Sequence, residues 1–82
     1  MARYTVRWLT YAEHQRDNLL PTGRRELNRL LDRLTADPRL QGTCDKNSEQ
    51  WTVAFGRHGI LLYTIEDRWI TITVLRVTWL ND

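Results

Sequence analysis

Apolar and polar residues alternate at the beginning of the chain. Over residues 4–9, Tyr4, Val6 and Trp8 fall on one side of an extended backbone, which is the pattern of a strand with one face in the core. The next segment, Thr10 to Asn18, is mostly polar and contains neither proline nor glycine. It therefore suits a short helix that ends before Leu20-Pro21.

A second helix has the clearest pattern in the sequence. Thr22 is a plausible N-cap, and Asp37-Pro38 would end the helix. Leucines recur at the spacing of one helical face, at Leu27, Leu30, Leu31 and Leu34. The following stretch, Arg39 to Gln50, is polar and has no period, so we expect a long loop there.

From Trp51 onward the period changes to two. Residues 51–55 alternate, and Gly56 to Gly59 forms a turn signal, which together predict a hairpin. Ile60 to Ile65 is nearly continuously apolar, as in a strand covered on both faces. After a tight turn at Glu66 to Arg68, a last strand is expected from Trp69 to about Val77.

The predicted element order is β-α-α-β-β-β, an α+β fold with a small antiparallel sheet packed on a helical pair. With 82 residues, the chain has room for a single domain, residues 1–82. Its 41% hydrophobic and 27% charged residues are typical of a folded chain rather than a disordered one.

The charge is small overall and uneven along the chain. Twelve basic and ten acidic residues give a net charge of +2, too little for binding phosphates through a bulk field. Residues 1–41 carry eight basic and five acidic residues, and residues 42–82 carry four and five. All the basic residues except Lys46 are arginines, which indicates either a coding bias or a preference for bidentate phosphate contacts.

Several kinds of site have no basis in the composition. The single cysteine, Cys44, has no disulfide partner, and with only two histidines we expect no tetrahedral metal site. We also expect no cofactor, because the sequence contains no phosphate-binding glycine loop or dinucleotide motif. The longest apolar run is too short to span a membrane, so a cytoplasmic protein without membrane contacts is expected.

The sequence resembles the RelE/ParE toxin superfamily. The resemblance spans nearly the whole chain and depends on these features: Leu20-Pro21 before an arginine-rich helix, its Leu-x-x-Leu-Leu-x-x-Leu pattern, Asp37-Pro38, Leu61 to Asp67, and Val74 to Val77. It implies the toxin of a bacterial toxin-antitoxin module, bound by a cognate antitoxin. It further implies either ribosome-dependent mRNA cleavage or DNA gyrase as the target, and it leaves a homodimer open.

The chain departs from the pattern of the RNA-cleaving members. These usually carry an arginine three residues before the central tyrosine, where this chain has Ile60. Of the functional groups expected near the C-terminus, only Arg76 is present. Three hypotheses therefore stay open: a metal-independent endoribonuclease with an incomplete motif, a gyrase-targeting member that acts by protein docking, and an inert binding module of the same fold.

Three residues are candidates for catalysis. Arg57 and His58 lie in the glycine-flanked turn, and the pKa range of histidine suits proton transfer near neutrality; a turn also tolerates exposed polar residues without any function. Arg76 could project onto the concave face of the sheet, where the resemblance places substrate-facing cations. It could equally be a cross-strand partner of Glu66 or Glu49.

Four further residues are candidates for RNA or partner binding. Arg25, Arg29 and Arg33 recur every four residues along the second helix, so they form one stripe. The stripe is either a solvated face or a docking surface for ribosomal RNA phosphates or an acidic antitoxin segment. Trp79 near the end of the chain could stack on a base or hold the tail against the helices.

Overall fold

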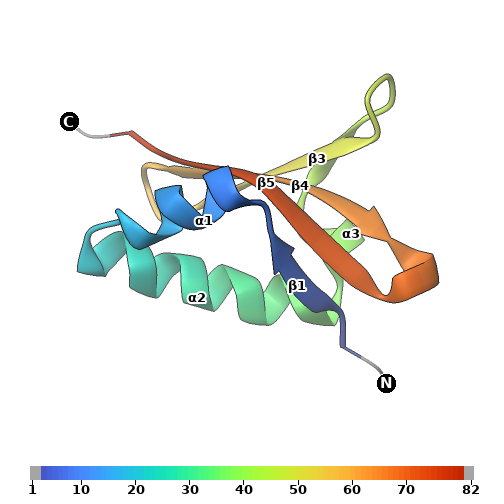
Figure 1. Cartoon of the computed structure of the whole chain (residues 1–82), viewed down its shortest axis with the longest axis horizontal. Coiled ribbons are helices and arrows are strands. Elements are labelled where there is room, and N and C mark those ends of the chain that lie inside the picture. Colours follow the sequence, from blue (N-terminus) through green and yellow to red (C-terminus); the bar gives the residue numbers. More distant parts are fainter. Residues whose placement is uncertain (1–2, 81–82) are drawn as a thin grey trace.

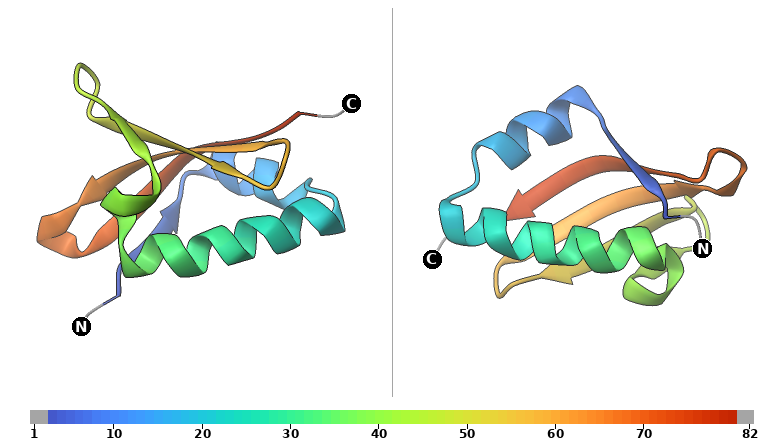
Figure 2. Two further views of the ribbon diagram at one scale, coloured as in Figure 1. Left: turned by 180° about the vertical axis from the view of Figure 1, so that it is seen from behind. Right: turned by 90° about the horizontal axis from the view of Figure 1, so that it is seen from below.

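Five strands form one mixed sheet, and the two longer helices, α1 and α2, lie side by side on one of its faces (Figures 1 and 2). The structure is a computed structural model, which describes residues 3–80. Its elements are β1 (Thr5–Trp8), α1 (Thr10–Asp17), α2 (Pro21–Ala36), α3 (Pro38–Gln41), β2 (Thr43–Asp45), β3 (Gln50–Phe55), β4 (Gly59–Glu66), a 3-10 turn (Asp67–Trp69) and β5 (Thr71–Trp79).

The strand order is β1-β5-β4-β3-β2. Strands β3 to β5 form the predicted three-stranded antiparallel meander, and β2 extends it by one strand that was not predicted. Strand β1 pairs with β5 in parallel, Thr5 opposite Thr71 and Trp8 opposite Val74. The sheet is therefore mixed, because the segment between β1 and β5 returns the chain to the same end of the sheet. The α+β class and the packing of helices on one sheet face are confirmed.

The core lies between α2 and the sheet. The leucines of α2 that fall on one face, Leu27, Leu30 and Leu34, are at most 1% exposed. They cluster with buried side chains of β3, β4 and β5, among them Phe55, Leu61, Tyr63, Ile72 and Val74. The leucines recur at this spacing because one face of the helix is buried against the sheet.

The prediction of a loop from Arg39 to Gln50 is wrong. It contains α3, which begins at Pro38, and the short edge strand β2, which pairs with β3. The Tyr63 hydroxyl donates a 2.7 Å hydrogen bond to the carbonyl of Pro38. Helix α3 is therefore held in place by a contact with the sheet, and its own sequence has no helical pattern of apolar residues. The strand β2 is short and largely exposed, and for this reason it lacks an apolar alternation.

Two element boundaries and the burial of one strand also differ from the prediction. Helix α2 begins at Pro21 with Leu20 as N-cap, so Thr22 is not the cap. The last strand begins at Thr71, because residues 67–69 form the 3-10 turn and Ile70 adopts a left-handed conformation with φ 48°. Strand β4 is covered on one face only, since Leu61 and Tyr63 are buried while Ile60 is 42% exposed.

A β-bulge in β5 decides which way the last side chains point. Tyr63 pairs with Val74 but Leu62 pairs with Arg76, so Leu75 is an extra residue in the strand. The bulge shifts the alternation by one position. Val77 therefore faces the helices and is buried, and its neighbour Arg76 is exposed on the opposite face.

Candidate functional site

The three candidate catalytic residues lie at two separate places. Arg57 and His58 occupy the turn between β3 and β4, next to the Gly59–Trp79 pair. Arg76 lies opposite Leu62, three residue pairs further along β4. At about 3.3 Å per residue, this separates Arg76 from the turn by roughly 10 Å along the strand.

The two places also belong to different faces of the sheet. Arg76 is exposed on the face that the helices leave uncovered, which we call the open face. The rings of His58 and Trp79 form a T-shaped pair with 5.8 Å between their centroids, and Trp79 lies on the buried face with Val77. The structure therefore brings Arg57, His58 and Trp79 together and leaves Arg76 apart from them.

The surroundings of Arg76 on the open face are mostly neutral. Its paired neighbour is Leu62, which pairs in turn with Thr52, and the next pairs place Ile60 between Ala54 and Thr78. Ile60, the position at which the resemblance leads one to expect an arginine in RNA-cleaving members, is thus a half-exposed isoleucine in a neutral surface.

Arg76 also does not pair with either predicted acidic partner. Among residues 3–80 it takes part in none of the ion pairs, and Glu66 instead accepts a 3.4 Å hydrogen bond from Thr73. A second arginine of the open face, Arg7 of β1, pairs with Thr73 and is exposed. The alternation of residues 4–9 placed Arg7 opposite the apolar side chains, and this was the signal that could have identified it.

A cavity of about 440 Å³ lies between the first turns of α2 and the β3–β4 turn. It is lined by Thr22, Glu26, Gly56, Arg57, His58 and Trp79. Trp79 also contacts Phe55, with 5.8 Å between ring centroids, and Gly23 of α2, where an added Cβ would lie 3.3 Å from the indole ring. The indole thus attaches the end of β5 to α2, which is the packing role considered for Trp79.

The arginine stripe lies on the outer surface of α2. Arg25, Arg29 and Arg33 are exposed, whereas the leucine face is buried against the sheet. The Arg29 guanidinium forms a 3.1 Å ion pair with Glu26, whose side chain lines the cavity beside Arg57 and His58. The helix carries the stripe on the side of the molecule away from the open face, so the stripe and Arg76 cannot contact one planar surface together.

The shifted pKa values belong to structural contacts. Burial, followed by the electrostatic effect of Cys44, raises the pKa of Tyr63 to about 12. Hydrogen bonds from Arg39 and then Tyr4 lower the pKa of Asp67. Both residues hold α3 to the sheet and the β4–β5 turn, and neither lines the cavity.

Two further findings concern the described residues. No group of three or more histidine, cysteine, aspartate or glutamate side chains within residues 3–80 could hold a metal ion. No helix in the same part of the chain is long and apolar enough to cross a membrane.

The chain is similar to solved structures of toxin-antitoxin complexes and of a toxin in the free state. The RelBE2 toxin-antitoxin complex of Mycobacterium tuberculosis contains a chain that matches with a TM-score of 0.84 and 26% identity, over 95% of this chain and 99% of that one. The intact E. coli RelBE complex matches with a TM-score of 0.77 and 18% identity, over 96% and 99%. A doubly arginine-substituted E. coli RelE in the free state matches with a TM-score of 0.81 and 18% identity, over 96% and 84%. No protein-family model and no curated protein matches the sequence.

Proposed function

We propose that this chain is a member of the RelE toxin superfamily and the growth-inhibiting toxin of a toxin-antitoxin module. The observation that carries the proposal is the match to the chain in the M. tuberculosis RelBE2 complex, which extends over 95% of this chain and 99% of its relative. A cognate antitoxin is then the partner, and the cytoplasm, which holds the targets of such toxins, is the site of action.

The proposed mechanism is docking on a protein target rather than cleavage of RNA. Its support is the separation of the candidate residues: Arg76 lies on the open face, and Arg57 and His58 lie at the cavity beside Trp79. Neutral side chains surround Ile60 on the open face. DNA gyrase is the target that the resemblance offers for this mechanism.

Induced expression in a bacterial host tests the first part of the proposal. We expect growth to stop when the chain is produced alone and to resume when the product of the adjacent gene is produced with it. Unchanged growth upon induction of a folded, stable protein would contradict the assignment as a toxin.

The mechanism is tested by measuring both activities in parallel. We expect inhibition of gyrase supercoiling by the purified protein, and no new mRNA 5′ ends by primer extension from arrested cells. The variants Arg76→Ala and Arg57→Ala/His58→Ala should retain toxicity if catalysis is absent. Codon-aligned cleavage that either variant abolishes would overturn docking in favour of an endoribonuclease.

A further inference from the structure

The cavity beside Trp79 combines the size of a ligand site with several kinds of polar group. Its volume of about 440 Å³ lies within the range of small-molecule sites in proteins, about 300–1,000 Å³. Three elements contribute to its lining: α2 with Thr22 and Glu26, the β3–β4 turn with Gly56, Arg57 and His58, and β5 with Trp79. Groups from distant parts of the sequence therefore converge on one small volume.

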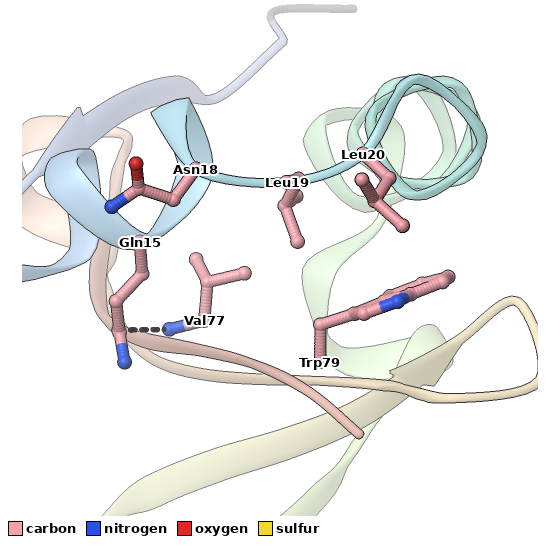
Figure 3. A pocket seen from close by; sticks show the side chains of 6 residues that line it. All are labelled: Gln15, Asn18, Leu19, Leu20, Val77 and Trp79. Carbon is pink, nitrogen blue, oxygen red and sulfur yellow. Dashed lines mark hydrogen bonds between the residues drawn. The ribbon is translucent and has the colours of Figure 1, made fainter. Parts of the chain in front are cut away.

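The indole of Trp79 is a fixed, apolar wall of this cavity. It packs against Gly23 of α2, where an added Cβ would lie 3.3 Å from the ring. Leu19 and Leu20 extend towards the same indole from the α1–α2 connection (Figure 3). A wall held by several contacts is in place before a ligand arrives, so binding requires little further ordering of the chain. The flat ring suits an apolar, planar part of a ligand.

The β3–β4 turn forms the opposite wall. Gly56 has a left-handed backbone with φ 61°, which glycine adopts without strain. An added Cβ at Gly56 would lie 3.2 Å from Cγ of Glu26 and 3.6 Å from the indole of Trp79. The backbone of the turn thus lies directly against α2 and β5, and this contact holds Arg57 and His58 at the cavity.

Basic side chains gather at the cavity. Arg57 is exposed, and among residues 3–80 it takes part in none of the ion pairs. The guanidinium of Arg25 donates a 3.5 Å hydrogen bond to the hydroxyl of Thr22, which lines the cavity. A third arginine, Arg29, lies 3.1 Å from the carboxylate of Glu26. Because a guanidinium binds phosphate oxygens through two parallel N–H bonds, this lining suits an anionic group.

Glu26 limits the charge that the cavity can accept. It is the one acidic residue of the lining, and its side chain is 32% exposed. Together with the three arginines it leaves a net charge of +2 when His58 is neutral. A phosphate monoester carries about −1.5 to −2 at pH 7, so one such group balances this charge. The carboxylate itself only accepts hydrogen bonds, and it therefore suits ligand hydroxyls, as acidic residues bind ribose in dinucleotide sites.

We propose that this cavity binds a ribonucleoside monophosphate. Its phosphate lies at Arg57 and His58, a ribose hydroxyl donates to Glu26, and the base lies against the indole of Trp79. Inorganic phosphate alone would leave the carboxylate and the indole without a partner, and an apolar ligand alone would leave the arginines without one. The inference goes beyond the proposed function and does not depend on it.

An NMR titration of the isotope-labelled protein with adenosine 5′-monophosphate (AMP) tests the site. We expect saturable shifts of the Trp79 indole N–H and of the Gly56 and Arg57 amides. Adenosine and ribose 5-phosphate each lack one recognised group and should bind about tenfold more weakly or less. Absent shifts would overturn the proposal. Inorganic phosphate that binds as tightly as AMP would identify an adventitious ion only, and would overturn it as well.

A pair of arginine variants tests the phosphate contact. Arg57→Ala removes charge-assisted hydrogen bonds and should weaken AMP binding by about tenfold or more. Arg68→Ala is the matched control, since Arg68 is exposed in the β4–β5 turn and its guanidinium lies 5.3 Å from the ring centroid of Trp69. This variant should bind AMP normally, and both should keep the original Tm. Equal losses of affinity for the two variants would show unspecific attraction of the anion and contradict the site.

The ribose contact has a readout of its own. The original chain should bind AMP about tenfold more tightly than 2′,3′-dideoxy-AMP, because the second ligand leaves Glu26 without a donor. Glu26→Gln removes a negative charge and strengthens the binding of any anion, so the ratio of the two affinities is the quantity to compare. We expect this ratio to fall towards one in the variant. An unchanged ratio would overturn the ribose contact.

A free nucleotide and the phosphorylated end of an RNA carry the same recognised groups. Titration with a 5′-phosphorylated tetraadenylate distinguishes these two sources. Tighter binding than that of AMP would identify the end of an RNA as the ligand, and equal or weaker binding would identify the free nucleotide. Binding of neither would overturn the site. All these measurements use the purified protein, so an absence of growth arrest would contradict the proposed function and leave this inference intact.

Discussion

Asp67 joins three segments that are distant in the sequence. Its Oδ1 accepts hydrogen bonds from the Tyr4 hydroxyl at 2.8 Å and from Arg39 at 2.9 Å, and its Oδ2 accepts a second bond from Arg39 at 2.6 Å. The β4–β5 turn is thereby tied to α3 and to the residue preceding β1. These bonds favour the ionised carboxylate, and they lower the pKa of Asp67.

We therefore expect Asp67→Asn to reduce the loss of stability in acid. The pKa of Asp67 is lower in the folded chain than in the unfolded one, where it is about 3.9. Its contribution is thus fully present above that value and is lost as the pH falls through the folded pKa. Thermal unfolding between pH 6 and pH 2 should show a smaller decrease in Tm for the variant.

Asp32→Asn is the matched control for Asp67. The Asp32 carboxylate forms no hydrogen bond or ion pair with the rest of residues 3–80, since Arg3 contacts only its backbone carbonyl. This variant should keep the acid dependence of the original chain. Equal slopes for Asp67→Asn and the original chain would contradict the role given to Asp67.

Tyr63 joins distant segments in the interior of the protein, as Asp67 does at its surface. Its ring is fully buried and lies 6.3 Å from that of Trp51, and its hydroxyl reaches the Pro38 carbonyl. Replacing it with phenylalanine leaves this buried carbonyl without its donor, which costs about 1–3 kcal/mol. Urea unfolding should measure that loss, and an unchanged free energy of unfolding would contradict it.

The same tyrosine predicts a loss of stability in base. Its pKa is about 12 in the folded chain and about 10 in an unfolded one. The contribution is present below pH 10 and is lost as the pH rises towards 12. The difference in tyrosinate absorbance between the original chain and Tyr63→Phe should have its midpoint near pH 12, and a midpoint near 10 would be the contrary result.

Among the elements, α2 contributes the largest buried stripe. Leu27 is fully buried, whereas Leu40 of α3 is 76% exposed. Leu27→Ala should lower the free energy of unfolding by about 2–5 kcal/mol, through lost burial and a cavity. Leu40→Ala should change it by no more than about 0.5 kcal/mol, and similar urea midpoints for both would contradict this account of the core.

The elements that the sequence reveals are those with a local pattern. The leucines of α2 and the alternation of residues 51–55 predict their elements because burial imposes a period on each of them. Strand β2 and helix α3 could not be recognised, since β2 depends on pairing with β3 and α3 on the hydroxyl of Tyr63. The bulge at Leu75 depends on how β5 pairs with β4, so no local sequence pattern predicts it.

For the molecule as a whole, the sequence predicts where the candidate residues lie along the chain but not how they lie relative to one another. Arg57 and His58 do lie together at a turn, as their flanking glycines indicated. The separation of Arg76 from them depends on the shift of alternation at Leu75. The hydrogen bond between the Val77 amide and the Gln15 side chain depends on where β1 ends. Both are properties of the assembled sheet.

The arginine stripe on α2 gives a prediction for the surface. Arg25→Glu/Arg33→Glu reverses two exposed charges and leaves the Arg29–Glu26 pair in place. If the stripe binds an acidic partner, antitoxin affinity should fall about tenfold or more at low salt and less at high salt, with Tm unchanged. Lys46→Glu in the β2–β3 turn is the control, and unchanged affinity for the double variant would identify the stripe as a solvated surface.

The parallel pairing of β1 with β5 fixes when the fold can be completed during synthesis. Strand β1 leaves the ribosome first, but its partner in the sheet is the last strand to be made. Residues 5–8 must therefore wait until residues 71–74 have emerged, and contacts between such distant segments form slowly. A nascent chain of this topology has no finished sheet, so an antitoxin already present has the full time of translation in which to meet it.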